Sequence, residues 1–251
     1  IVHESPVLGT SDVYTRRSGG PESSNALMGP GSYLTMIFSA TFWGHIIGGI
    51  GGVLMDIINK TALKSSRFYL IALAVVMGAF TYGGVLPWIG IYLGNEGMTD
   101  QSVPIAVTLL AIFGIIGKLT FGYLAESITA RNAMALSLGG QIISILLLVC
   151  FASTFLVWVL VSVYGLFMGA WGALVSLIVL ENFGVKNFGS ISGVLGLAST
   201  VSLFAGPILA GIIFDLADSY ASAFIIMTVF FMVGIISILN VRQTDLQTRK
   251  S

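Results

Sequence analysis

Charged residues are scarce in this sequence. Of its 251 residues, 11 are Lys or Arg and 11 are Asp or Glu, together 9%, whereas a soluble domain carries about 25%. So few charges cannot cover a 26.5 kDa protein in water, and the mean hydropathy is +0.97. Because the two signs balance to zero, the composition argues against a nucleic-acid partner and a polybasic lipid-binding surface. It predicts an integral membrane protein whose main solvent is the lipid bilayer.

Cysteine and histidine are almost absent as well. One cysteine, Cys150, excludes an intrachain disulfide framework and a cysteine-rich metal site. The long apolar segments hold no cluster with metal-ligand or nucleophile–base spacing. Neither a metal nor a cofactor is therefore expected.

Long apolar runs dominate what is present. Each of six is long enough to cross a bilayer, which takes about 20 residues, and too long for a strand of a membrane β-barrel. The sequence predicts an all-α, polytopic protein with a six-helix bundle over residues 60–241. The six runs are 68–93, 103–125, 133–151, 155–180, 190–214 and 221–241.

The two ends of the chain are predicted to differ from this bundle. Residues 1–30, rich in Ser, Gly and Pro, indicate a disordered lead or loop. Residues 31–59 predict an extra hydrophobic helix, which either spans the membrane or lies in its interface, since glycines at 48–52 weaken an isolated helix. Residues 242–251 form a predicted cytoplasmic tail.

The distribution of basic residues predicts the orientation. When the start of run 68–93 is placed in the cytoplasm, the outer loops carry no Lys or Arg. The positive-inside rule then puts both ends of the six-helix region, and so the C-terminus, in the cytoplasm. The expected location is the plasma membrane or a bacterial inner membrane. Charges in the outer loops are all acidic: Glu96, Asp100, Asp215 and Asp218.

A motif of two glycines five residues apart, with an acidic residue four positions after the second, occurs twice at an offset of 89 residues. This offset spans three helices, an odd number, so the two units would have opposite orientations in the membrane. Inverted repeats of three helices are a transporter feature that places a binding site near the membrane midplane. The alternative is glycine-mediated packing in an ordinary bundle. The matched positions are Gly117, Gly122 and Glu126 in the second run and Gly206, Gly211 and Asp215 in the fifth.

Several motifs resemble those of a known family. Residues 122–131, GYLAESITAR, resemble the cytoplasmic signature G-x-L-A-D-R-x-G-R of the major facilitator superfamily, with Glu126 for Asp, Ser127 for a basic residue and Thr129 for Gly. Residues 181–184, ENFG, and 206–215, GPILAGIIFD with Pro207, also resemble this family. Over about residues 60–241 the chain is similar to the C-terminal half of the monocarboxylate-porter and oxalate/formate-antiporter branch.

The resemblance implies both a mechanism and a missing partner. It implies secondary active transport of a small organic anion, a monocarboxylate or a dicarboxylate, by alternating access, with proton symport or exchange as the driving force. It also implies an N-terminal six-helix half, and the absent initiator Met predicts that this chain is a truncated one. Gating residues implied at the cytoplasmic side are Gly122, Glu126, Arg131 and Glu181.

Lys118 is the only basic residue inside the six apolar runs. A lysine at the centre of a membrane helix costs about 2.5–3.5 kcal/mol, and Lys118 lies about 10 Å from the cytoplasmic edge of its run. Either its side chain reaches for the headgroups, or its ammonium faces a polar cavity and attracts an anion. The resemblance implies the anion-attracting role, because the monocarboxylate and oxalate branch has an Arg at this position that pairs with the substrate carboxylate. A Lys keeps that charge without the bidentate geometry.

Aromatic and amide side chains complete the predicted site. Tyr82, Tyr164 and Trp171 could supply hydrogen bonds and an apolar wall for a small anion, although membrane helices also use aromatics for packing. Gln141 is predicted to link helices. Two functions from other classes stay open, a non-transporting structural fragment and a polytopic membrane enzyme, and the lack of a catalytic cluster disfavours the enzyme. Substrate identity, coupling ion and oligomeric state are not specified by the sequence.

Overall fold

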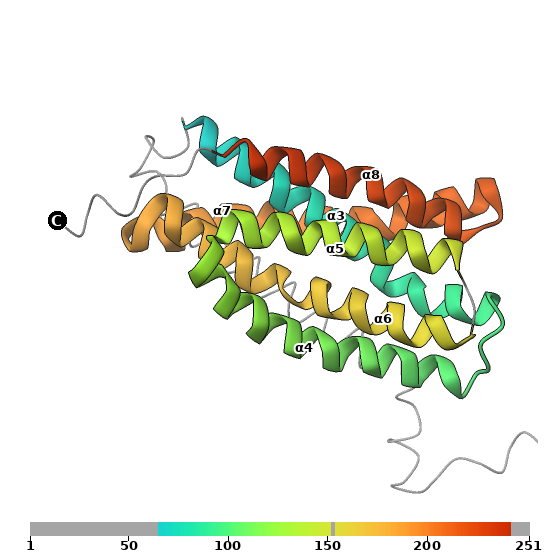
Figure 1. Cartoon of the computed structure of the whole chain (residues 1–251). Helices are drawn as coiled ribbons and strands as arrows, with labels where there is room; N and C mark the ends of the chain where they lie inside the picture. The colour runs from blue at the N-terminus through green and yellow to red at the C-terminus, as the bar shows by residue number, and fades with distance from the viewer. Residues whose placement is uncertain (1–64, 152–153, 242–251) are drawn as a thin grey trace, which may run out of the picture. The chain divides into compact units, whose positions relative to one another are not determined.

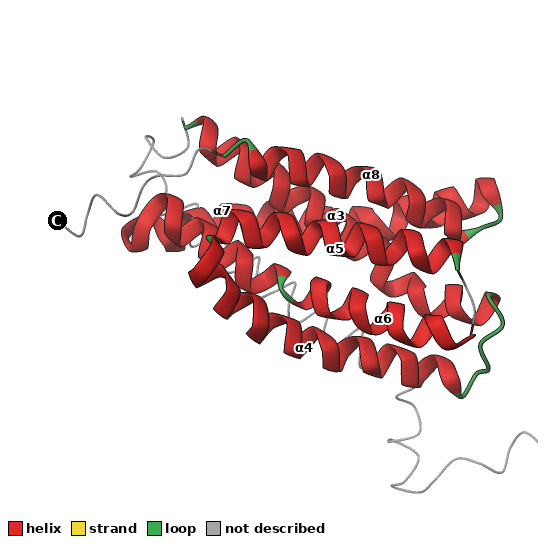
Figure 2. Ribbon diagram, in the orientation of Figure 1, coloured by secondary structure: helices red, strands yellow, loops and turns green. Residues whose placement is uncertain are grey.

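The computed structural model describes residues 65–151 and 154–241, and nearly all of them are helical. No strand occurs in these two ranges, so the predicted all-α class is confirmed (Figure 2). The predicted lead 1–30, the extra helix 31–59 and the tail 242–251 lie outside the described residues. The helices are α3 (Ser66–Asn95), α4 (Ser102–Ile128), α5 (Ala130–Cys150), α6 (Thr154–Gly169), α7 (Trp171–Ala217) and α8 (Tyr220–Leu239) (Figure 1).

Gly184 divides α7 into two arms. Five stretches of the described chain are long and apolar enough to cross a membrane, and one of them, Phe155–Ala217, has 63 residues. A straight helix of that length would extend about 95 Å, three times the hydrocarbon thickness. Gly184 interrupts it with φ 72° and ψ 171°, a conformation that glycine adopts most readily. The N-terminal arm (171–183) therefore completes the crossing begun by α6, and the C-terminal arm (185–217) forms the next, which gives six crossings as predicted.

The helices pair as two inverted units of three helices would require. Counted along the chain, the first crossing (α3) packs along the fifth (C-terminal arm of α7), where Gly83 meets Leu203. The second crossing (α4) packs along the fourth, which begins with α6. Inversion of one unit onto the other exchanges these two pairs. The third and sixth crossings, α5 and α8, pack against each other, with Leu138 beside Gly234 and Arg131 beside Val241. This arrangement agrees with the predicted inverted repeat.

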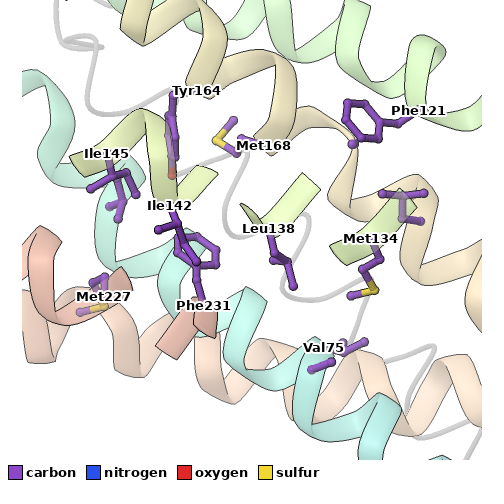
Figure 3. Packing of buried hydrophobic residues seen from close by; sticks show 14 of the residues in the cluster. Val75, Phe121, Met134, Leu138, Ile142, Ile145, Tyr164, Met168, Met227 and Phe231 are labelled. Atoms are coloured by element: carbon purple, nitrogen blue, oxygen red, sulfur yellow. The ribbon is translucent and has the colours of Figure 1, made fainter. Parts of the chain in front are cut away.

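A continuous apolar core joins the six helices. Its fully buried members include Leu138 and Ile145 of α5, Phe231 of α8 and Tyr164 of α6, within the cluster that Figure 3 shows. Large apolar side chains also cover the outside of the bundle, such as Leu119, which is 71% exposed. An apolar exterior of this kind requires lipid or another apolar surface as its surroundings.

Candidate functional site

Lys118 lies midway along α4, next to a close helix–helix contact. A Cβ atom built on its neighbour Gly117 would collide with the backbone carbonyl oxygen of Leu166 in α6. Lys118 therefore lies at the depth of Leu166, shortly before the interruption of the fourth crossing at Ala170. Ten residues separate it from the end of α4 at Ile128, which corresponds to about 15 Å along the axis.

The face of α4 that carries Lys118 can be located from the helical period. Val107 precedes Lys118 by 11 residues, or three helical turns, so the two side chains lie on one face. A Val107 methyl group lies 3.8 Å from the position that a Cβ on Gly90 of α3 would occupy. Lys118 therefore lies on the same face of α4 as Val107, and it is exposed.

Tyr82 and Trp171 meet between α3 and the N-terminal arm of α7. Their rings stack with centroids 6.2 Å apart and planes inclined by 28°. The pyrrole edge of Trp171 lies over Gly78, where an added Cβ would be 3.2 Å from the indole Cδ1. The indole Nε1 is buried and has no hydrogen-bond partner among the described residues. Two predicted site residues are thus in contact, and one of them holds an unused donor.

Tyr164 is placed differently from these two aromatics. It is only 1% exposed and belongs to the buried core (Figure 3). Its hydroxyl is buried as well and has no hydrogen-bond partner within residues 65–151 and 154–241. In this conformation Tyr164 does not reach an accessible surface.

Two of the four predicted gating residues make defined contacts where α4 ends and α5 begins. Both carboxylate oxygens of Glu181 accept from the Ala130 amide, at 3.1 and 3.3 Å. Ala130 begins α5 directly after Thr129, which has a positive φ of 76°. Arg131 donates from Nη1 to the Val241 carbonyl at 2.9 Å. The loop between α4 and α5 is thereby connected to α7 and to the chain just beyond α8.

The other two predicted gating residues are less engaged. Glu126 is exposed, and a Cβ on Gly122 would meet no atom within 4 Å. In this conformation neither residue is held against another helix in the way that Glu181 is held against α5.

The glycines of the repeat divide into two kinds. A Cβ on Gly206 would collide with backbone atoms of Phe80 and Gly84 in α3, as one on Gly117 would with α6. Gly211 has only the Trp88 ring within reach, at 3.9 Å. Gly117 and Gly206, the inner pair of the repeat, thus mark equivalent close contacts of the two units. Gly122 and Gly211, the outer pair, do not. Pro207 lies inside α7 and Asp215 is exposed near its end.

Sequence reasoning missed a polar contact that crosses from α5 to α6. The Ser137 hydroxyl donates to the Phe167 carbonyl at 2.7 Å. Gln141, predicted to link helices, donates from Nε2 to the Ser137 carbonyl and hydroxyl, each at 3.4 Å, so it reaches α6 only through Ser137. A serine four residues before a buried glutamine was the available signal.

The described residues contain no group of His, Cys, Asp or Glu suited to a metal ion.

Comparisons with known proteins agree with this architecture. The family model described as Major Facilitator Superfamily matches residues 68–250. Monocarboxylate transporter 12 of Homo sapiens is 26% identical over 177 residues, which is 65% of this chain and 33% of that protein. Monocarboxylate transporter 14 of Mus musculus is 26% identical over 167 residues, 64% of this chain and 32% of that protein. The chain therefore spans about a third of the length of these curated relatives.

A solved structure shows the same fold. The fucose:proton symporter FucP of E. coli superposes with a TM-score of 0.60 at 18% sequence identity. The match covers 72% of this chain and 44% of the symporter.

Proposed function

Because this chain belongs to the Major Facilitator Superfamily, we propose that it is part of a secondary transporter that carries a small organic anion by alternating access. A carrier is favoured over an enzyme, since family and fold point to transport. The carrier is an integral membrane protein, and its C-terminus lies in the cytoplasm according to the distribution of basic residues.

The position of Lys118 is the observation that carries the anion assignment. It lies about 15 Å from the end of α4, at the depth of Leu166, as the contact of its neighbour Gly117 indicates. An ammonium at this depth is costly unless water or an anion solvates it. Attraction of a carboxylate in a cavity of low dielectric offsets that cost. The related proteins named monocarboxylate transporters support a carboxylate as the cargo.

The aromatic pair supplies the second element of the site. Tyr82 and Trp171 stack between α3 and the N-terminal arm of α7, and the buried Trp171 N–H has no hydrogen-bond partner among the described residues. A small carboxylate held by Lys118 would place its apolar part on these rings, and it would accept from the indole in a conformation of the transport cycle that exposes Nε1, which is buried here. Tyr164 belongs to the proposed site only if another conformation of the transport cycle exposes its hydroxyl, because here it is buried.

The N-terminal half of the carrier is the proposed partner of two exposed faces. The exposed side chains on α4 and on the C-terminal arm of α7 are strongly apolar, including Ile115 at 66% and Val201 at 71% exposure. These two helices occupy equivalent places in the inverted units. The chain matches 44% of the fucose:proton symporter, about the length of one half. We place a second six-helix bundle on these faces, with the substrate between the halves.

Protons are the proposed coupling ions, with exchange as the alternative. The fucose transporter of the same fold is a proton symporter by name. Glu181 and Asp215 lie close to Gly184 and to the end of α7, respectively, so neither is a deep proton carrier. The proton site is then Lys118 itself or a residue of the N-terminal half. The segment from Gly122 to Arg131, together with Glu181, would stabilise one facing state.

Uptake by the full-length protein in liposomes tests this function. Labelled pyruvate, succinate and fucose represent a monocarboxylate, a dicarboxylate and a neutral sugar of similar size class. We expect saturable uptake of one or both anions, stimulated by an inward proton gradient or by internal anion, and none of fucose. Equal uptake of all three, or uptake of fucose alone, would contradict the proposal.

A further inference from the structure

The crossing formed by α6 and the N-terminal arm of α7 is interrupted near its middle. α6 ends at Gly169 and α7 begins at Trp171, although Ala170 itself keeps helical angles of φ −63° and ψ −30°. In a continuous helix the Phe167 carbonyl would accept from the Trp171 amide. Here that carbonyl accepts from the Ser137 hydroxyl of α5, at 2.7 Å. The interruption therefore coincides with a hydrogen bond from another helix.

The side chain of Phe167 is fixed from the same helix. A Cβ on Gly140 would collide with the Phe167 ring, so the absence of a side chain there lets the ring lie directly on α5. On its other side the ring meets Phe121 edge-on, with centroids 5.7 Å apart. The carbonyl of Phe167 is thus held by α5, and its ring lies between α5 and α4.

Ser137 is itself held in place. It is 1% exposed, as is Gln141, whose amide donates to the Ser137 carbonyl and hydroxyl. The serine hydroxyl has one proton to donate, and its short distance to Phe167 shows where that proton goes. The hydroxyl therefore donates to α6 and accepts from Gln141 of its own helix.

We propose that Ser137 is a positioning residue for Trp171. By donating to the Phe167 carbonyl it holds the end of α6 against α5 just before the break at Ala170, and this sets the direction in which Trp171 leaves the break toward Gly78 and Tyr82. α5 thus controls the shape of the substrate site without touching the substrate. The inference rests on the proposed function insofar as Trp171 binds cargo, but the effect of Ser137 on Trp171 is independent of it.

A spectroscopic measurement tests the positioning directly. In a full-length variant that keeps Trp171 as the only tryptophan of this chain, with Trp43, Trp88 and Trp158 replaced by Phe, Ser137→Ala should shift the Trp171 emission maximum and alter its quenching by acrylamide. Ser144→Ala is the matched control, because Ser144 is equally buried on α5 but donates within its own helix to Gly140. The control should leave both quantities unchanged.

Transport kinetics give the second readout. With labelled pyruvate and the native tryptophans, Ser137→Ala should raise KM about threefold, the size expected for one interhelical hydrogen bond in a membrane, with little change in maximal rate. Gln141→Leu provides a second variant should Ser137→Ala fail to fold, and it should shift KM in the same direction by less.

The outcomes separate this inference from the proposed function. An emission shift in Ser137→Ala together with no anion uptake by the native protein would support the positioning and overturn the transport proposal. Unchanged emission and KM in Ser137→Ala, or equal changes in Ser144→Ala, would overturn the positioning role while leaving transport intact.

Discussion

The carboxylate of Glu181 caps the first turn of α5 from a different helix. Both of its oxygens accept from the Ala130 amide, at 3.1 and 3.3 Å, and Thr129 before it gives no side-chain cap to α5. An anion at a helix N-terminus is stabilised by the free amides and by the helix dipole. The end of the N-terminal arm of α7 is therefore tied to the start of α5.

Replacement of Glu181 should weaken this connection in proportion to the charge lost. We expect Glu181→Ala to lower the free energy of unfolding by about 1 kcal/mol, and Glu181→Gln, which keeps an oxygen acceptor, by less. Thermal unfolding in detergent measures both. Glu126→Ala is the control, because Glu126 is exposed and should change stability little. A loss in Glu126→Ala as large as in Glu181→Ala would contradict the capping role.

Substitution by alanine should destabilise the protein far more at the inner glycines of the repeat than at the outer ones. Gly117→Ala and Gly206→Ala each place a Cβ against the backbone of a neighbouring helix, and such overpacking costs about 1–3 kcal/mol. Gly122→Ala and Gly211→Ala meet open space or an ordinary contact, so they should be neutral or gain up to about 1 kcal/mol from helix propensity. Unfolding midpoints of the four variants check this, and four similar values would refute the equivalence of Gly117 and Gly206.

The Trp171 N–H should matter for cargo and not for stability. Trp171→Phe keeps a ring beside Tyr82 but removes a donor that has no partner within the described part of the chain. KM for pyruvate should rise about tenfold, which corresponds to about 1.4 kcal/mol, at unchanged stability. Trp88→Phe is a matched control, since Trp88 also holds a buried unpaired N–H but stacks on Tyr220 instead. Equal KM changes in the two variants would remove Trp171 from the site.

Removal of the Tyr164 hydroxyl should not destabilise the protein. That hydroxyl is buried without a partner among the residues described, and an unsatisfied buried polar group is unfavourable. Tyr164→Phe should leave the free energy of unfolding unchanged or raise it by up to about 1 kcal/mol. Tyr92→Phe should instead lower it by about that amount, because the Tyr92 hydroxyl donates to the Leu148 carbonyl at 3.3 Å. Denaturation curves that reverse this order would contradict the hydrogen-bond assignment.

The crossings could be predicted from sequence because a bilayer imposes a length of about 20 apolar residues. Polar residues near 182–187 predicted a loop between the fourth and fifth runs, and the reversal occurs at Gly184. The interruption at Ala170 could not be predicted, since alanine is the best helix former and the hydrogen bond beside that break joins Phe167 to Ser137, 30 residues earlier.

The orientation of the aromatics was also beyond the sequence. In a membrane helix the core face and the lipid face are both apolar, so no hydrophobic stripe marks which side turns inward. Tyr82 and Trp171 proved to be in contact, whereas Tyr164 proved to be buried in the core. For the same reason the close contacts of Gly117 and Gly206 could be proposed as a pair from their spacing, but their partners in α6 and α3 could not be named.

Anion uptake by Lys118 variants tests the central claim most directly. Reconstituted full-length protein should lose at least about tenfold of its pyruvate uptake in Lys118→Ala and Lys118→Gln, because hydrogen bonds to charged groups contribute about 1.5–3 kcal/mol. Lys118→Arg should keep a substantial part of the uptake. Lys186→Ala, which removes an exposed lysine two residues after Gly184 in α7, should behave as the native protein does. Native uptake in a folded Lys118→Ala protein would contradict the account.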